Sequence, residues 1–405
     1  MRFSRALALA ALVGFALRLA YALALVKSKP LLGDALEFHL QANLLADGKG
    51  YIQPFLYLAT GEAHASADKP PLYPFLEALI SLAGGRSAAW HHLVGVLAGT
   101  GTIVVVGLIA RRVAAPRAGL IAAGLAAVYP LLIAADGSLR SESVYALCLS
   151  LVLLAALRFR DAPDARHGAV LGVAIAAAAL TRGEALVLLG LLVLPLGWRH
   201  RRSGLVTLAA CVLALAPWLT RCWIAFDQPV VISTNVGGLL AGANCDTTYA
   251  GPLLGQWDFG CLPKATSANE AVVAGRLRDQ GLRYARDHAG RLPVVIAARL
   301  GRSFELYKPR EQATQEAFYE GRNLRVEQAG VALYYLLALL AIGGAVLLAR
   351  RRGPWWVLAA PVGMVVFVTV ISYGFTRFRV GAEPAIVVLA AVALDGLVAR
   401  RRAKA

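Results

Sequence analysis

The sequence predicts an all-α polytopic membrane protein with about ten transmembrane helices, outer interfacial helices and one extracytoplasmic loop subdomain. Three observations support this class. Hydrophobic residues make up 58% of the 405 positions, the mean hydropathy is +0.62, and apolar runs recur along the whole chain between clusters of arginine. A soluble domain is seldom so apolar. In hydrocarbon each backbone polar group needs a partner within its own segment, so the apolar runs should be helices.

The first span is expected at about residues 5–26. The basic sequence "MRFSR" precedes it, which favours a cytoplasmic amino terminus. A cleaved signal peptide is the alternative for this segment. We favour a retained span because the apolar run is long and further spans follow. Arg18 lies inside this run and is expected to snorkel outward.

Nine further spans are expected, at about 92–110, 118–134, 143–157, two short helices within 168–198 broken by "TRGE", and then at 205–221, 329–349, 354–373 and 382–398. Both termini are then cytoplasmic. The arginine clusters all fall on the cytoplasmic side, as the positive-inside rule requires: Arg111, Arg112, Arg117, Arg158, Arg160, Arg199, Arg201, Arg202, Arg350–Arg352 and Arg400–Arg402. These clusters explain the net charge of +17, and nucleic acid is not expected as a partner.

The chain is expected to divide into an N-terminal transmembrane catalytic module (1–224, with an outer loop at 31–91), an extracytoplasmic loop subdomain (225–328) and C-terminal transmembrane helices (329–405). Residues 70–85 have too short an apolar core to span a bilayer and predict an interfacial helix. A helix should follow a cap at Ser267 or Asn269. Cys245 and Cys261 lie in the outer loop and are a disulfide candidate, with two reduced thiols as the alternative.

Acids and bases gather where the predicted spans reach the outer surface. Ionisable side chains in such places are costly unless they face water or each other, so they indicate a cavity that opens outward. Carboxylates can act as general bases, and lysine or arginine can hold phosphate. Transfer from a phosphate-linked lipid donor to a hydroxyl fits this set: Asp34, Glu37, Asp68, Lys69, Asp136, Arg140, Glu142, Arg182, Glu184, Arg221, Arg377 and Arg379.

Six segments occur in an order that resembles the GT-C glycosyltransferases of family 39, which include protein O-mannosyltransferases and the aminoarabinose transferases that modify lipid A. They are "GDALEFHLQANLLADGKGY", "DKPPLYPFLEAL", "SLRSESVYAL", "LTRGEAL", "APWLTR" and "YGFTRFRVGAEPAI". The resemblance implies an inverting transfer from a polyprenyl-phosphate sugar to a hydroxyl on a cell-envelope lipid, glycan or protein. It places the reaction on the extracytoplasmic face of the plasma (inner) membrane.

The resemblance assigns roles to the acids. Asp34 would be the general base, with a helix cap as the alternative reading. Family members often carry an adjacent Asp-Glu pair, whereas here Ala35 follows and Glu37 lies one turn on, so the role of Glu37 stays open. Glu142 would be the second acid, which orients the acceptor or the sugar, and Asp136 is a rival for that role.

The resemblance also assigns the phosphate-binding residues. Lys69 would hold the donor phosphate, with a headgroup lysine as the alternative. Arg377 and Arg379 would bind the departing lipid phosphate, since alternate residues of an extended stretch lie on one side. Two further arginines are candidates for this site: Arg182 and Arg221.

No cofactor is required by this chemistry, and the sequence contains no Walker A or Rossmann glycine pattern. His64 and Asp68 have a spacing that suits a divalent metal, with a surface histidine as the alternative. A transporter or lipid-linked-substrate flippase is the alternative function. Transporters tend to carry internal repeats and charges near the bilayer midplane, whereas these charges lie at the outer ends of the predicted spans.

Overall fold

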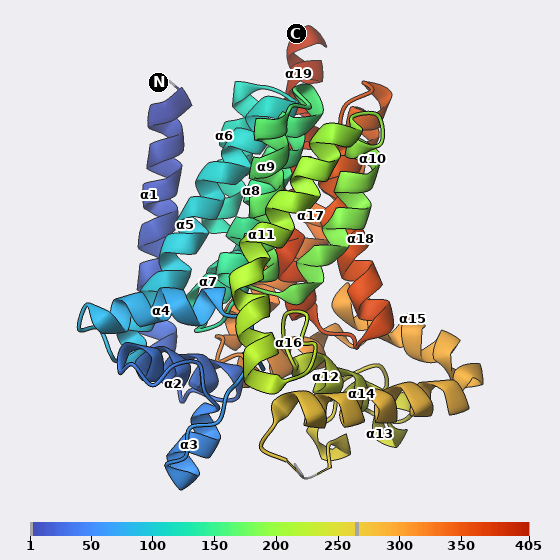
Figure 1. Ribbon diagram of the computed structural model, residues 1–405. Coiled ribbons are helices and arrows are strands. Elements are labelled where there is room, and N and C mark those ends of the chain that lie inside the picture. Colours follow the sequence, from blue (N-terminus) through green and yellow to red (C-terminus); the bar gives the residue numbers. More distant parts are fainter. Residues whose placement is uncertain (1–2, 264–266, 405) are drawn as a thin grey trace.

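The computed structural model describes residues 3–263 and 267–404 and folds them into a helical bundle (Figure 1). Both chain ends lie at one end of the bundle, and the helices within residues 34–82 and 235–319 lie at the other. This arrangement agrees with the prediction that both termini are on the same side of the membrane. The charged segments between spans are therefore divided between two distinct faces.

Six of the ten predicted spans are long apolar helices or a bent pair. Within the described residues, five helices are long and apolar enough to cross a membrane: α1 (Phe3–Tyr21) continued by η1 (Ala22–Val26), α5 (Ala88–Val113), α8 (Glu142–Asp161), α11 (Arg201–Phe226) and α17 (Leu324–Arg350). A sixth span forms if α6 (Pro116–Val128) and α7 (Pro130–Gly137) are counted together, although they meet at 55°. Pro130 explains the bend, because proline disfavours a helical conformation in the residue before it.

The other four predicted spans coincide with helices that are shorter or more charged. They are α9 (Ala165–Ala179), the segment η2 (Gly183–Leu186), η3 (Leu189–Val193) and α10 (Leu194–Gly197), then α18 (Trp355–Ile371) and α19 (Glu383–Lys404). The last of these carries Asp395, which pairs with Arg117 at 2.5 Å.

Close helix approaches hold the bundle together. A side chain at Gly172 of α9 would meet the backbone of α11 at Thr207, and one at Gly344 of α17 would meet α19 at Leu389. Small residues at such contacts are typical of membrane helices, where van der Waals packing replaces the hydrophobic effect. The α9–α11 and α17–α19 pairs are in contact along much of their length.

Two helices cross the outer end of the bundle. The helices α2 (Asp34–Ala46) and α4 (Leu72–Leu82) run across the spans, with α3 (Pro54–Thr60) beyond them (Figure 1). The predicted interfacial helix is α4, and it packs between α2 and α5. These contacts fix the start of α2 over the bundle.

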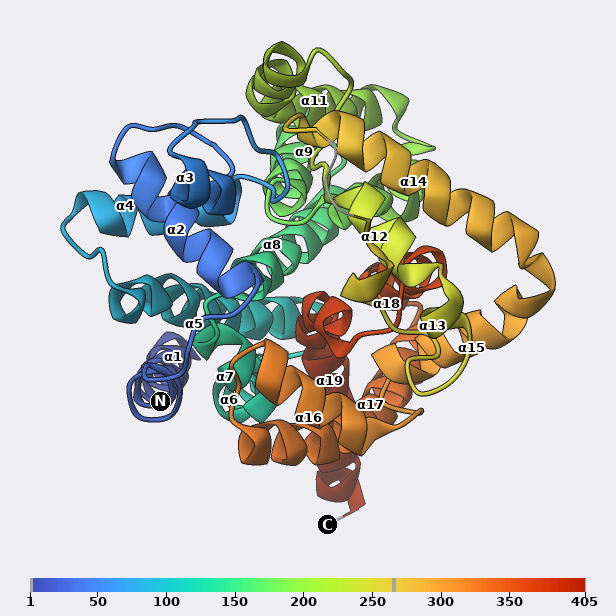
Figure 2. The same cartoon turned by 90° about the horizontal axis from the view of Figure 1, so that it is seen from below.

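The remaining outer helices are α12 (Asn235–Ala243), α13 (Asp246–Tyr249), η4 (Phe259–Cys261), α14 (Glu270–Asp287), η5 (Ala289–Arg291), α15 (Leu292–Ser303) and α16 (Pro309–Tyr319). Seen from below, they cover the side of the bundle opposite α2 and α4 (Figure 2). Asn269 caps α14, since its side chain accepts bonds from the amides of Ala271 and Val272. This decides between the two predicted caps.

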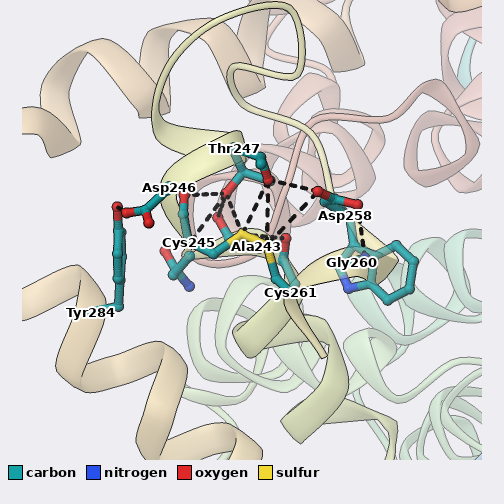
Figure 3. The surroundings of a disulfide bond; sticks show 12 residues. Ala243, Cys245, Asp246, Thr247, Asp258, Gly260, Cys261 and Tyr284 are labelled. Carbon is teal, nitrogen blue, oxygen red and sulfur yellow. Dashed lines mark hydrogen bonds between the residues drawn. A yellow bond between two sulfur atoms is a disulfide. The ribbon is translucent and has the colours of Figure 1, made fainter. Parts of the chain in front are cut away.

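Cys245 and Cys261 form a disulfide with an S–S length of 2.00 Å (Figure 3). Thr247 donates its hydroxyl to the Asp258 carboxylate at 2.7 Å, within the 16-residue loop that the disulfide closes. Tyr284 of α14 donates to Asp246 at 2.7 Å. The disulfide therefore belongs to a bonded outer layer that joins α13 to α14.

Candidate active site

Four charged residues from separate parts of the chain meet at the outer end of the bundle. Asp34 begins α2, Lys69 precedes α4, Arg140 precedes α8, and Arg377 lies in the short helix η6 (Thr376–Gly381). Each lies at an element boundary, as the hydropathy pattern predicted for outer helix ends. The structure brings together the outer charges that the sequence predicts to share one cavity.

Asp34 is the shared anion of this cluster. Its Oδ1 lies 3.3 Å from Lys69 Nζ, and its Oδ2 lies 3.0 Å from both Arg140 Nη1 and Arg377 Nη1. Burial alone would raise the pKa of Asp34, but Lys69, Arg377 and Arg140 hold it well below its ordinary value. The side chain keeps 26% of its surface exposed, so it can meet a molecule that enters from outside.

The local backbone explains why Asp34 is available. Gly33 occupies the N-cap position of α2 with φ of 52°, a region that glycine adopts readily, and no side chain caps the helix there. The carboxylate of Asp34 is therefore engaged with cations rather than with helix amides. This excludes the alternative that Asp34 serves as the cap.

Lys69 joins three carboxylates. Besides Asp34, its ammonium lies 3.3 Å from Glu37 Oε2 and 2.5 Å from Asp68 Oδ2. Burial would lower the pKa of Lys69, but the three acids raise it well above its ordinary value, so it stays charged. Burial raises the pKa of Glu37 to about 8 despite the neighbouring Lys69.

The backbone around Lys69 is fixed from both sides. Pro70 and Pro71 follow it and lack amide hydrogens, and the amide of Leu72 bonds the carbonyl of Leu180 at 2.8 Å. Arg221 donates to the carbonyls of Ser66 and Tyr51. The structure thus gives Arg221 a supporting place beneath this loop, outside the group of cations around Asp34.

Glu142 lies behind the cluster and has no exposed side-chain surface. Its Oε1 accepts from Arg182 Nη1 at 2.8 Å and from Arg377 Nε at 2.7 Å, and Arg182 also bonds Glu184 at 2.5 Å. A carboxylate in this position orients two arginines. It cannot reach a sugar or an acceptor without moving, which makes the predicted orienting role indirect.

Arg140 and Glu320 also belong to the cluster; the sequence places Arg140 among the outer charges and gives no sign of Glu320. Arg140 donates to the Tyr319 carbonyl at 2.7 Å, and its Nε lies 2.7 Å from Glu320 Oε2. Glu320 also lies 3.7 Å from Arg377 Nη1. Arg140 stood in the "SLRSES" segment, which offered a signal. Glu320 follows α16 in a polar stretch that carries no recognisable pattern.

The prediction that Arg379 would share a site with Arg377 is wrong. The stretch is a 3₁₀-helix rather than extended, and residues two apart do not share a face in such a helix. Arg379 is buried, bonds Glu383 at 2.6 Å and donates to the Ser303 carbonyl at 3.0 Å. It therefore joins η6 to α19 and α15.

Arg18 and Asp136 are likewise removed from the site. Arg18 does not snorkel outward, because its Nε bonds Asp136 Oδ2 at 2.6 Å and its other nitrogens donate to the carbonyls of Ala126 and Ala127. Both side chains are buried. Asp136 is therefore a structural partner of α1 and no rival of Glu142.

The predicted metal pair does not assemble. His64 bonds Glu62 at 3.2 Å, whereas Asp68 bonds Lys69. Among residues 3–263 and 267–404, no three His, Cys, Asp or Glu side chains are grouped to hold a metal ion. Asp34, Glu37 and Asp68 all contact the ammonium of Lys69 instead.

Comparison with known proteins supports the resemblance. A family model described as dolichyl-phosphate-mannose-protein mannosyltransferase matches residues 68–223. No curated protein sequence matches the chain. The match covers the loop with Lys69, the turn with Glu142 and the segments with Arg182 and Arg221.

Solved structures share the fold. The oligosaccharyltransferase AglB of Archaeoglobus fulgidus, in complex with an inhibitory peptide and a dolichol-phosphate, matches with a TM-score of 0.62 at 16% identity, over 98% of this chain and 50% of that one. The same enzyme with Zn and sulfate matches at 0.60 and 17%, over 98% and 49%. ArnT from Cupriavidus metallidurans bound to undecaprenyl phosphate matches at 0.46 and 17%, over 98% and 78%.

The chain spans about half the length of the oligosaccharyltransferase that it matches. At such identities the match concerns the fold. The family model covers four of the six ordered segments, and it supports the resemblance together with the shared fold. The chain is a multi-pass membrane protein with the fold of the GT-C glycosyltransferases.

Proposed function

We propose that the protein is an inverting glycosyltransferase that moves a sugar from a polyprenyl-phosphate donor to a hydroxyl acceptor. The observation that carries the proposal is the partly exposed carboxylate of Asp34, which lies within 3.3 Å of Lys69 and 3.0 Å of Arg377. A base and two phosphate-binding cations are the groups that this reaction needs. The family model for dolichyl-phosphate-mannose users and the dolichol-phosphate held by AglB support the donor class.

An apolar cavity offers a place for the donor's isoprenoid chain. It has a volume of about 720 Å³ and lies between α15 and α18, where Val294, Phe304 and Val366 contribute to its lining. Helix α15 also packs against η6, which carries Arg377. The helix that lines most of this cavity thus contacts the element that carries Arg377.

In the proposed reaction the acceptor hydroxyl gives its proton to Asp34 as its oxygen attacks the anomeric carbon. The new bond joins that oxygen to the carbon, and the bond from the carbon to the phosphate oxygen breaks. The electron pair leaves with the polyprenyl phosphate. Attack opposite to the leaving group inverts the configuration. Lys69 and Arg377 stabilise the negative charge that develops on the phosphate.

The proposal gives each part of the chain a task. Residues 1–224 supply the base and Lys69, residues 225–328 cover the donor cavity, and residues 329–405 supply Arg377. Helix α2, which begins with Asp34, lies at the end of the bundle opposite the termini (Figure 1). With the arginine-rich termini in the cytoplasm of the cell, the reaction takes place at the extracytoplasmic face of the plasma membrane.

We propose that no divalent metal is required, because the Lys69 ammonium already stands among three carboxylates. His64 and Asp68 stay engaged with other partners. Transfer that persists in the presence of a chelator would agree with this. Loss of transfer that Mg²⁺ or Zn²⁺ restores would contradict it.

The test is transfer of label from polyprenyl-phosphate sugars in membranes that contain the full chain. The Asp34→Asn variant should lose about 10²–10⁴-fold in rate, the usual contribution of a general base. Asp47→Asn is the matched control, because Asp47 follows α2 and pairs with the exposed Arg86 outside the charged cluster. Separating labelled lipid, glycan and protein fractions identifies the acceptor class. An active Asp34→Asn enzyme would remove Asp34 as the base.

The transporter or flippase alternative predicts a different result. A transporter needs charges along a path through the bilayer, whereas this cluster lies at its outer end. Movement of intact donor across the membrane without formation of a glycosidic bond would support that alternative.

A further inference from the structure

We propose that the donor phosphate and Asp34 compete for the same two cations, so that binding of the donor frees the carboxylate to act as base. The inference rests on the proposed function and concerns the regulation of that same site. It follows from the three cations that contact Asp34 in the structure.

Both oxygens of Asp34 are occupied by cations. Lys69 faces Oδ1 at 3.3 Å, and Arg377 faces Oδ2 at 3.0 Å. These are also the two residues that the proposed function assigns to the phosphate. A carboxylate held in this way is a weak base, because each cation favours its charged form over its protonated form. Before the donor binds, Asp34 is therefore a poor acceptor for the proton of an acceptor hydroxyl.

The cations differ in how easily they can change partner. Lys69 and Arg377 keep 13% and 15% of their side-chain surface exposed, whereas Arg140 keeps 4%. Arg140 is also tied to Glu320 and to the Tyr319 carbonyl. Arg377 is held by Glu142 through Nε, and its Nη1 faces Asp34. An entering phosphate can thus take Lys69 and Arg377, while Arg140 remains on Asp34 and keeps it oriented.

The electrostatic balance at Asp34 supports this exchange. Burial pushes the pKa of Asp34 upward, and only the three surrounding cations hold it well below the ordinary value. When two of them turn to a phosphate, burial and the added negative charge both act in the same direction. The base then becomes competent at the moment when a leaving group is in place, and an acceptor that arrives first is not activated.

Competition predicts that removing the charge of Asp34 strengthens phosphate binding. A role of Asp34 as base alone predicts no such change in affinity. Asp34→Asn removes the competing charge and should bind undecaprenyl phosphate about tenfold more tightly than the wild type, the magnitude of one charge-assisted hydrogen bond. The experiment measures binding of undecaprenyl phosphate to the full chain in nanodiscs. Asp47→Asn, which removes an equal charge outside the cluster, should bind like the wild type.

A second variant keeps Asp34 intact. The double substitution Glu37→Gln/Asp68→Asn is measured above pH 8, where Glu37 is ionised, and removes two carboxylates that contact Lys69 and do not pair with Arg377. It should bind about threefold more tightly, because only one of the two cations is released from competition. This variant tests the competition even if Asp34→Asn does not fold.

The outcomes separate the two proposals. Unchanged or weaker binding by Asp34→Asn, or by the double variant, would overturn the competition while the proposed donor stands. If the wild type binds no undecaprenyl phosphate and Lys69→Met binds the same, the donor class itself is wrong. Tighter binding by both variants, with Asp47→Asn unchanged, supports the inference.

Discussion

Two kinds of buried ion pair occur in this protein, and they differ in how their charges are shared. Inside the bundle the pairs are closed: Arg18 with Asp136, and Arg379 with Glu383. At the outer end, Asp34 accepts from three cations and Glu142 from two. In a closed pair each ion has one oppositely charged partner, and the pair joins two helical segments. A shared ion has several such partners, so it can lose one and remain paired.

The difference has a physical basis in desolvation. Removing one member of a closed buried pair leaves a charge with neither water nor a partner, which is strongly destabilising. In the outer cluster each anion retains another cation when one is lost, and Asp34, Lys69 and Arg377 keep some exposure to water. Closed pairs should therefore control folding, and shared ones should control activity.

The largest effect is expected from Arg379→Met. It leaves Glu383 buried and uncompensated, and we expect a loss of about 3–5 kcal/mol in stability. Melting temperature and the yield of monodisperse protein in detergent measure it. The double variant Arg379→Met/Glu383→Met should recover much of the loss, because no charge is then stranded. If Arg379→Met is as stable as the wild type, closed pairs do not control folding, and the two regions do not differ in this way.

Arg377→Lys should separate activity from folding. Arg377 bonds Glu142 through Nε and Asp34 through Nη1, and a single ammonium cannot reproduce that fork. Transfer should fall about 10²-fold or more, as for loss of one preorganised charge donor. The melting temperature should stay close to that of the wild type, since Arg182 and Arg140 still compensate the two acids. A large loss of stability would show that this residue behaves as a closed pair.

The pH dependence of donor binding should reveal Glu37. Its pKa of about 8 lies above the ordinary value, so the side chain is neutral below pH 8 and becomes a carboxylate above it. Its contribution to stability is thus complete at acidic pH and is lost as the pH rises through about 8. The ionised form also competes for Lys69, so the affinity for a sugar phosphodiester should fall about threefold across that step.

Glu37→Gln is the control for this dependence, since the amide does not titrate. A phosphodiester donor keeps one charge throughout the range, so it adds no step of its own. An unchanged step in Glu37→Gln would assign the titration to another group.

The outer ends of the spans could be predicted because hydropathy alone locates them. Asp34, Lys69 and Arg377 each interrupt or follow an apolar run, and their convergence follows from the helices being packed in one bundle. Arg379 was misplaced because a two-residue spacing predicts a shared face only if the backbone is extended. The structure has a 3₁₀-helix there, and no residue in "TRFRVG" signals that choice.

Other parts of the site depend on tertiary contacts that leave no local trace. Arg18 and Asp136 are 118 residues apart, and neither sequence neighbourhood indicates the other. Glu320 reaches Arg140 across 180 positions from a polar stretch without periodicity. Such pairs arise from which helices pack together, so a single sequence does not specify them.

The smallest effect is expected from Glu184→Gln. This variant tests whether an arginine with two acidic partners tolerates the loss of one. Glu184 contacts Arg182, and Arg182 also bonds the fully buried Glu142. Because the arginine keeps that partner, stability should change by less than about 1 kcal/mol, the range of partly exposed pairs. Transfer should stay within about twofold, since Glu142 still holds Arg377. A much larger loss would mean that Arg182 depends on Glu184 alone, and that the outer cluster is a chain of closed pairs after all.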